Sequence, residues 1–234
     1  MTLAPDALLR RGFVYRELVA LGATFGEIDG AACALEIDGA DEAARAEGLA
    51  LCDLSPLPRA GYKGRETRAW LAARGVRVPE ADNRATRQDD GWLAARLAPG
   101  EVLLLAGLDG GRATADRLAA AWSPDPDPGV YPVPRADTNC WFAITGRHGA
   151  EMMAKLCGVD LRPHKFSEGA IAQTSVARLN AIVLRADLGA TLAYHLLTDG
   201  ASASYMWGCI TDAMAEYDGA IVGLAALRTL AGKT

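Results

Sequence analysis

The sequence is poor in the features that mark several large classes of protein. Of its 234 residues, three are histidines and 6% are aromatic, and its five cysteines are scattered without a CxxC pair. The 24 basic and 29 acidic side chains give a net charge of −5, so the basic excess that nucleic-acid binding usually needs is missing. The histidines show no HExxH motif and no Cys/His ligand spacing, which argues against a metal site.

Long apolar runs are missing as well. The most apolar late stretch, Gly219 to Leu230, contains Arg228 and is much shorter than the roughly 20 residues that a membrane span needs. The N-terminus has Asp6 before any apolar run and no signal-peptide core. We therefore expect a cytoplasmic protein that binds neither membrane nor nucleic acid, and whose cysteines are free thiols in a reducing compartment.

What is present is a globular composition, half hydrophobic and 23% charged, with a proline-rich stretch near its middle. Residues 123–134 hold five of the eleven prolines, and proline neither continues a helix nor donates to a central strand. The stretch is predicted to be an extended connector. It divides the chain into a first half-domain, residues 1–122, and a second, residues 135–234. Apolar residues near helical spacing predict that the first begins with a helical extension over Met1 to Gly22.

The two halves share an order of predicted elements. In each, a strand ends at a glycine, Gly64 or Gly146, and the helix that follows stops at Gly75 or Gly158. Strand-like runs and a helix opened by a Gly-containing turn then complete a βαββα unit. The strand-like runs are residues 91–97 and 101–106 in the first half and 173–179, 181–185 and 191–197 in the second. The repeat predicts an α+β fold of duplicated half-domains with antiparallel sheets around one core.

Two loops and a histidine carry residues that often serve chemistry. Leu108 to Gly111 joins a strand to a helix and could cradle a phosphate, but a similar turn at Thr198 to Gly200 favours a structural helix entry repeated by duplication. Asp89-Asp90-Gly91 offers paired carboxylates for acid–base chemistry, and it is also ordinary hairpin chemistry, which we favour. His195 lies within a strand-like run and is expected to point outward.

Several stretches of the chain resemble known families. Residues 22–29, GATFGEID, and 45–64, RAEGLALCDLSPLPRAGYKG, resemble glycine-cleavage T-proteins, which are aminomethyltransferases. Residues 157–166, CGVDLRPHKF, 169–174, GAIAQT, and 204–207, SYMW, resemble the gamma subunit of heterotetrameric sarcosine oxidase. These two families are similar to each other, and together the resemblances cover nearly the whole chain.

The resemblance implies a duplicated, folate-binding-type α+β domain and a place in one-carbon metabolism. It implies oxidative demethylation of sarcosine with transfer of the one-carbon unit to tetrahydrofolate. FAD, FMN and NAD are then expected only on larger flavin- and dinucleotide-binding partner subunits. This chain would be a non-catalytic, gamma-like subunit that binds no cofactor alone, although tetrahydrofolate remains possible.

Three departures from the T-protein pattern favour the subunit hypothesis over an enzyme. The segment that carries the essential Asp of T-proteins is shortened here to Arg87 to Gly91, with the carboxylates before the glycine. The stretch matching their pterin-binding Glu motif, Gly189 to Tyr194, contains no acid. The chain ends at Thr234, so we expect it to lack the C-terminal barrel domain of T-proteins.

The residues that would line a folate pocket, if one survives, are expected where the two halves meet. They are Asp53 and Tyr62 on the first repeat's strand, and Arg178 and Tyr194 in the second repeat. A stand-alone folate-binding protein or aminomethyltransferase-like enzyme is the alternative function. A small enzyme using Asp89 and Asp90 is a third and weaker interpretation. No catalytic residue and no metal ligand is predicted.

The scattered cysteines give a first testable prediction. Thiol titration of denatured, unreduced protein should give five free thiols per chain, because no spacing indicates a disulfide framework. A count well below five would contradict the expected reducing compartment.

Overall fold

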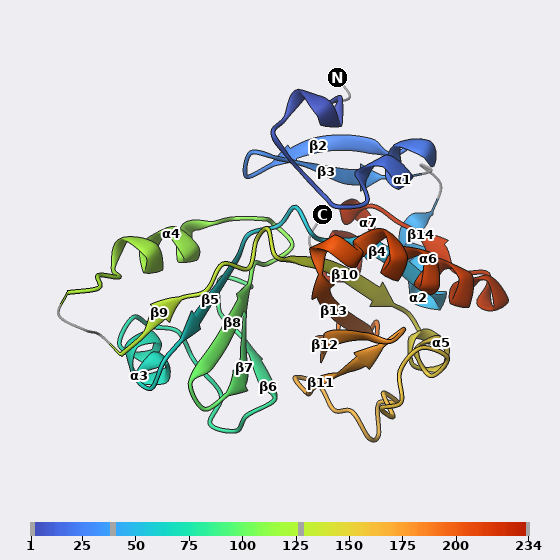
Figure 1. Ribbon diagram of the computed structural model, residues 1–234. Coiled ribbons are helices and arrows are strands. Elements are labelled where there is room, and N and C mark those ends of the chain that lie inside the picture. The colour runs from blue at the N-terminus through green and yellow to red at the C-terminus, as the bar shows by residue number, and fades with distance from the viewer. Residues whose placement is uncertain (1–2, 38–40, 126–128, 233–234) are drawn as a thin grey trace.

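Three sheets organise the chain in the computed structural model, which describes residues 3–37, 41–125 and 129–232 (Figure 1). The N-terminal sheet has the order β1 (Arg10–Arg11), β3 (Ala31–Glu36), β2 (Thr24–Ile28). The first large sheet has the order β6 (Arg84–Arg87), β7 (Leu93–Ala98), β8 (Glu101–Leu105), β5 (Arg59–Lys63), β9 (Tyr131–Pro132). The second large sheet has the order β11 (Ile171–Val176), β12 (Leu179–Arg185), β13 (Ala193–Asp199), β10 (Asn139–Thr145), β4 (Ala50–Asp53), β14 (Ala220–Ile221).

Short helices connect and cover these sheets. The α-helices are α1 (Tyr15–Ala20), α2 (Glu42–Gly48), α3 (Thr67–Ala72), α4 (Ala113–Ala120), α5 (Gly149–Met153), α6 (Ala203–Met214) and α7 (Leu224–Leu230). The 3-10 helices are η1 (Pro5–Ala7), η2 (Gly200–Ser202) and η3 (Ala215–Tyr217). Among the described residues, no helix has the length and apolarity that a membrane crossing requires.

The duplication is visible in the order of strands within the two large sheets. The first unit runs β5, α3, β6, β7, β8, α4, and the second runs β10, α5, β11, β12, β13, α6. In both, the three later strands form an antiparallel meander whose last strand pairs with the first strand of the unit. The predicted α+β fold with largely antiparallel sheets is confirmed. Each unit has one more strand than βαββα. In the first unit the additional strand is β6, which the sequence analysis missed, whereas the three later strands of the second unit match its three predicted strand-like runs.

The two units exchange a strand. β4 precedes β5 in the chain but pairs with β10 in the second sheet, and β9 precedes β10 but pairs with β5 in the first sheet. Both pairings are antiparallel. β9 lies within the predicted connector, of which residues 126–128 are outside the described residues. Since each sheet is completed by a strand from the other half, neither half forms its sheet alone.

The body of the protein has four layers, in the order helices, sheet, sheet, helices. Hydrophobic clusters lie on both faces of each large sheet and hold these layers together. Between the sheets, Leu103 and Leu105 of β8 pack in one cluster with Trp141 of β10 and Leu197 of β13. Helices α3 and α4 cover the outer face of the first sheet, and α5 and α6 cover the outer face of the second (Figure 1). The edges also meet, since the Ala85 amide donates to the Gly169 carbonyl oxygen at 2.7 Å.

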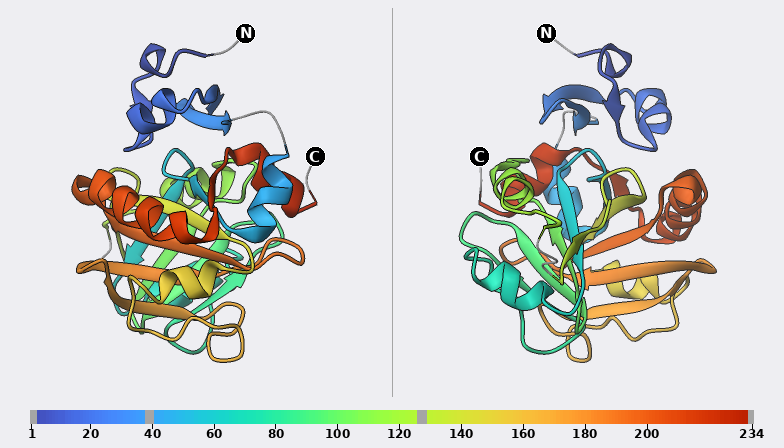
Figure 2. Two further views of the ribbon diagram at one scale, coloured as in Figure 1. Left: turned by 90° about the vertical axis from the view of Figure 1, so that its right-hand side faces the viewer. Right: turned by 60° about the vertical axis from the view of Figure 1, so that its left-hand side comes forward.

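The N-terminal segment departs from its prediction. The prediction of a helix over Met1 to Gly22 is wrong for most of that segment. Only α1 and η1 are helical there, and β1 pairs in parallel with β3. Residues 1 and 2 of that helix lie outside the described residues. The apolar residues that suggested one face, such as Val14 and Leu18, are buried against the body of the protein instead. Both views of Figure 2 place this N-terminal sheet at one end of the molecule, above the large sheets.

Two matching glycines fit the exchanged strands closely. Gly64 after β5 and Gly146 after β10 have φ angles of 141° and 101°, which favour glycine. A Cβ on Gly64 would lie 2.2 Å from the carbonyl oxygen of Gly129, two residues before β9. A Cβ on Gly146 would lie 2.4 Å from the carbonyl oxygen of Gly48, two residues before β4. The absence of a side chain at both places lets the exchanged strand approach.

Replacing one of these glycines should therefore destabilise the fold. We expect Gly146→Ala to lower the free energy of unfolding by about 2 kcal/mol or more, since it adds backbone strain and a clash with a main-chain oxygen. Urea unfolding measures the change. Gly158→Ala is the matched control, because a Cβ there meets nothing within 4 Å, and its effect should be about 0.5 kcal/mol or less. Equal effects of the two substitutions would contradict this role of Gly146.

Candidate functional site

The structure does not bring the four sequence-predicted pocket residues together. Tyr62 on β5 lies in the outer cluster of the first sheet, 5.1 Å from the Trp70 ring. Tyr194 on β13 lies in the outer cluster of the second sheet and donates to the Leu161 carbonyl oxygen at 2.5 Å. Burial raises the pKa of both phenols, that of Tyr194 to about 12. The two tyrosines thus point away from the space between the sheets, because each occupies the outward register of its strand.

The other two predicted residues lie apart as well. Arg178 is exposed in the turn between β11 and β12, with a φ of 69°. Asp53 is buried at the end of β4, where its Oδ1 accepts the Ser55 amide at 2.9 Å. Of the four, Asp53 is the buried carboxyl.

A line of buried polar side chains, which the sequence analysis missed, runs between the two large sheets. Trp141 on β10 donates from Nε1 to Nδ1 of His195 on β13 at 3.0 Å, and the guanidinium of Arg59 lies 5.9 Å from the Trp141 ring centroid. His195 is 3% exposed and Arg59 6%. The expectation that His195 points outward is wrong. β13 is buried on both faces, so the alternation of side chains along it does not show on which face His195 lies.

Several atoms of these side chains lack hydrogen-bond partners. Within the described ranges, the buried atoms that have no hydrogen-bond partner include Asp53 Oδ2, Arg59 Nε and Nη1, and His195 Nε2. Burial raises the pKa of Asp53 to about 6, lowers that of Arg59 to about 10 and lowers that of His195 to about 4. An unmatched buried polar atom costs free energy, so this interior is not fully satisfied by the protein itself.

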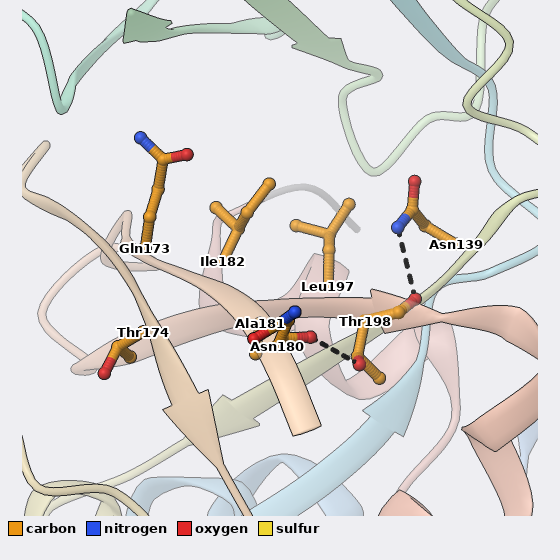
Figure 3. A pocket seen from close by; sticks show the side chains of 8 residues that line it. All are labelled: Asn139, Gln173, Thr174, Asn180, Ala181, Ile182, Leu197 and Thr198. Carbon is orange, nitrogen blue, oxygen red and sulfur yellow. Dashed lines mark hydrogen bonds between the residues drawn. The ribbon is translucent and has the colours of Figure 1, made fainter. Parts of the chain in front are cut away.

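An open pocket of about 380 Å³ lies on the inner face of the second sheet (Figure 3). Gln173, Ile182 and Leu197 point into it from three adjacent strands, and Asn139 stands at its side. The remaining lining residues are Thr174, Asn180, Ala181 and Thr198. The Gln173 amide donates to Asn83 Oδ1 at 2.8 Å and to the Leu97 carbonyl oxygen at 2.7 Å, which ties the two sheets together.

The chemistry of this pocket is neutral. Its lining combines amides, hydroxyls and apolar side chains and contains no ionisable group. Such a surface binds a molecule through hydrogen bonds and apolar contact. It offers no acid, base or nucleophile of unusual reactivity.

A second pocket of about 520 Å³ contains the paired aspartates Asp89 and Asp90. Asp89 receives two hydrogen bonds of 2.9 Å from Arg77, which lower its pKa. Asp90 accepts from the Thr114 hydroxyl at 2.6 Å and from the Trp92 amide. Both are held in the turn between β6 and β7, where Gly91 donates to the Gln88 carbonyl oxygen. The arrangement is that of a hairpin turn, since both carboxylates accept hydrogen bonds from neighbouring residues of the same unit.

No metal centre is formed by the described residues, which contain no group of three or more His, Cys, Asp or Glu side chains placed to hold an ion. All five cysteines are free thiols, as predicted, and four of them are buried. Burial raises the pKa of Cys33 and of Cys140 to about 12, so these thiols are not activated nucleophiles.

Comparison with solved structures identifies the fold. A chain of the heterotetrameric sarcosine oxidase from Corynebacterium sp. U-96, in complex with pyrrole 2-carboxylate, matches with a TM-score of 0.65 at 21% identity. The match covers 89% of this chain and 96% of that one. The glycine cleavage system aminomethyltransferase T from Bartonella henselae matches with a TM-score of 0.73 at 16% identity.

The second match covers 95% of this chain, which spans 62% of the aminomethyltransferase. No family model and no curated protein sequence matches. The chain therefore has an aminomethyltransferase-like α+β fold, and at these identities the likeness concerns the fold alone.

The buried histidine predicts a particular dependence of stability on pH. Folding lowers the pKa of His195 to about 4, whereas an unfolded histidine titrates near 6.5. Between these values the unfolded chain binds a proton that the folded protein does not. The contribution of His195 to the free energy of unfolding therefore falls by about 3 kcal/mol as the pH drops from about 6.5 to about 4. His195→Asn, which keeps an acceptor for Trp141, should lose this component in urea unfolding at several pH values.

The exposed His164→Asn is the matched control and should keep the wild-type slope. Asp53 contributes with the opposite sign in wild type and variant alike, because its raised pKa gives the folded protein an extra proton between about 3.8 and about 6. The difference between wild type and variant therefore isolates His195. An unchanged slope in His195→Asn would contradict a buried neutral imidazole.

Proposed function

We propose that this chain is a non-catalytic, gamma-like subunit of a sarcosine-oxidase-type complex. The observation that carries the proposal is the end-to-end match to a chain of a heterotetrameric sarcosine oxidase, of which 96% is covered. The aminomethyltransferase match leaves more than a third of that enzyme without a counterpart. In this complex the chain supports oxidative demethylation of sarcosine and transfer of the one-carbon unit to tetrahydrofolate.

The chemistry of the pockets supports a role without catalysis. The 380 Å³ pocket has no carboxylate, whereas the N–H edge of a pterin is normally bound by one that accepts two hydrogen bonds. The paired aspartates belong to a hairpin turn and are held by Arg77 and Thr114. Neither pocket contains an acid–base pair ready for chemistry at the carbon of an amine.

The partners in this proposal are larger flavin- and dinucleotide-binding subunits, which hold FAD, FMN and NAD. Exposed apolar side chains support a docking face on the N-terminal segment of this chain. Leu9 is 99% exposed, Val19 49% and Leu21 47%, and all three lie within residues 9–21. A stable complex would bury roughly 800 Å² on each partner.

A stand-alone folate-binding protein or aminomethyltransferase-like enzyme is the second candidate. The higher TM-score of 0.73 with the aminomethyltransferase favours it. So does the 380 Å³ pocket, whose amides offer donors and acceptors to a heterocycle. In that case the chain would bind tetrahydrofolate by itself.

Affinity purification through this chain, after co-expression with the genes beside its own, separates the two candidates. We expect flavoprotein subunits to be recovered with it, and we expect the isolated chain to show no aminomethyltransferase activity. Leu9→Glu/Leu21→Glu should lower recovery of the partners about tenfold or more, because it places charges on a desolvated face. Lys165→Glu at another exposed site is the control and should leave recovery unchanged.

Recovery of the chain alone, together with micromolar tetrahydrofolate binding by calorimetry, would replace the subunit proposal with the stand-alone one.

A further inference from the structure

Two arginines of the N-terminal segment are held against one aromatic ring. Arg11, at the end of β1, and Arg16, in α1, both contact the ring of Tyr15, and their guanidinium carbons lie 5.0 Å and 4.9 Å from its centroid. The two positive charges are therefore closer together than about 10 Å, which is the Debye length at 0.1 M salt. Salt screens their mutual repulsion only in part.

Among the described residues, no acid forms an ion pair with either of these guanidiniums. Of the three arginines within residues 10–16, Arg10 alone has such a partner, Asp29 at 3.6 Å. Glu17 is engaged elsewhere, since it accepts from the Ser204 hydroxyl at 2.7 Å. The stacked pair is thus a local excess of positive charge on a chain whose net charge is −5.

The stacked pair adjoins an exposed apolar side chain and a recess in the surface. Leu9 is 99% exposed, and together with Arg11 it lines a pocket of about 160 Å³. Phe13 and Pro56 give this pocket apolar walls, and Asp137 is the one acid in its lining. Positive charge, an apolar side chain and a space for a short side chain therefore lie next to one another.

These residue types favour a protein partner over other anionic surfaces. A guanidinium binds a carboxylate through two parallel hydrogen bonds and can stack on an aromatic ring. Arginine and tyrosine are also enriched among the residues that contribute most to protein–protein binding. Anionic membranes are recognised by clusters of about four to eight basic residues, and nucleic acid needs a wider basic patch. Two guanidiniums beside a leucine are too few for either.

We propose that Leu9, Arg11, Tyr15 and Arg16 form a docking surface for an acidic segment of a partner protein. Carboxylates of that segment pair with the two guanidiniums, and an apolar side chain packs against Leu9 and enters the recess. The inference deepens the proposed function and rests on it for the identity of the partner, a larger subunit of the complex. It adds the chemistry of that subunit's docking segment, which is acidic and partly apolar.

NMR titration of the full chain with a defined peptide tests the docking surface without any partner subunit. The probe is acetylated Glu-Glu-Leu-Leu-Glu-Glu, and the control peptide has Gln in place of every Glu. The acidic probe should shift the amide signals of residues 9–16 saturably, with a Kd of roughly 1 mM or below. It should bind about fivefold or more tightly than the Gln peptide, because it alone brings charge to the two guanidiniums.

Substitutions on the surface separate its charged part from its apolar part. Arg11→Gln/Arg16→Gln should weaken binding of the acidic probe about fivefold or more and leave the Gln peptide unaffected. Leu9→Ser should weaken binding of both peptides. Arg45→Gln/Arg147→Gln is the matched control, because it removes two exposed arginines outside this surface, and it should bind like wild type. Circular dichroism establishes that each variant is folded.

Equal affinity for the two peptides, or shifts confined to signals outside residues 9–16, would overturn the docking surface. Unchanged binding of the acidic probe to Arg11→Gln/Arg16→Gln would overturn it too. If vesicles containing phosphatidylserine shifted the same signals more strongly than the acidic probe, the surface would be a membrane contact instead.

The proposed function fails by a different measurement. If the wild-type chain recovers no flavoprotein subunit, the identity of the partner is wrong, while the peptide titration still decides whether the surface takes an acidic segment. If the subunits are recovered equally well by wild type and by Arg11→Gln/Arg16→Gln, the subunit proposal stands and the acidic docking segment is wrong.

Discussion

The exchange of β4 and β9 between the two large sheets is the constraint on which the rest of the structure depends. Each strand leaves its own half and pairs with the first strand of the other, so the two repeats share one interior. The pairing brings main-chain atoms into close approach at Gly64 and Gly146, where no side chain fits. The leucines of β8 then pack between the sheets with Trp141 and Leu197. A change that weakens either crossing acts on both sheets, because each lacks a strand without the other.

The same crossings explain why charged groups are buried in this protein. Asp53 is the last residue of β4 and Arg59 the first of β5, so the short link that carries the chain from one sheet to the other takes both inside. The second crossing, from β9 to β10, supplies the Ala136 carbonyl oxygen to Arg59. The unmatched atoms of Asp53 and Arg59 therefore lie near the two crossings, and Gly12 of the N-terminal segment packs against Asp53 Oδ2.

The fold is that of aminomethyltransferases, but the fold alone assigns no chemistry. In this chain the 380 Å³ pocket has a neutral lining, and Asp89 and Asp90 are held in a hairpin turn by Arg77 and Thr114. The unmatched polar atoms of Asp53 and Arg59 lie instead on either side of the link between β4 and β5.

The sequence by itself determined the repeated order of elements except for β6, and it predicted the free thiols and the Asp-Asp-Gly turn. Those features rest on local signals: glycines that end helices, prolines that interrupt them, and cysteines without partner spacing. Only the tertiary structure decided that residues 10–11 form a strand, that β4 and β9 exchange sheets, and that Tyr62 and Tyr194 face outward while His195 faces inward. The reason is physical. Alternation separates the two faces of a strand, but when helices cover one face and a second sheet covers the other, both faces are apolar and long-range pairing alone tells them apart.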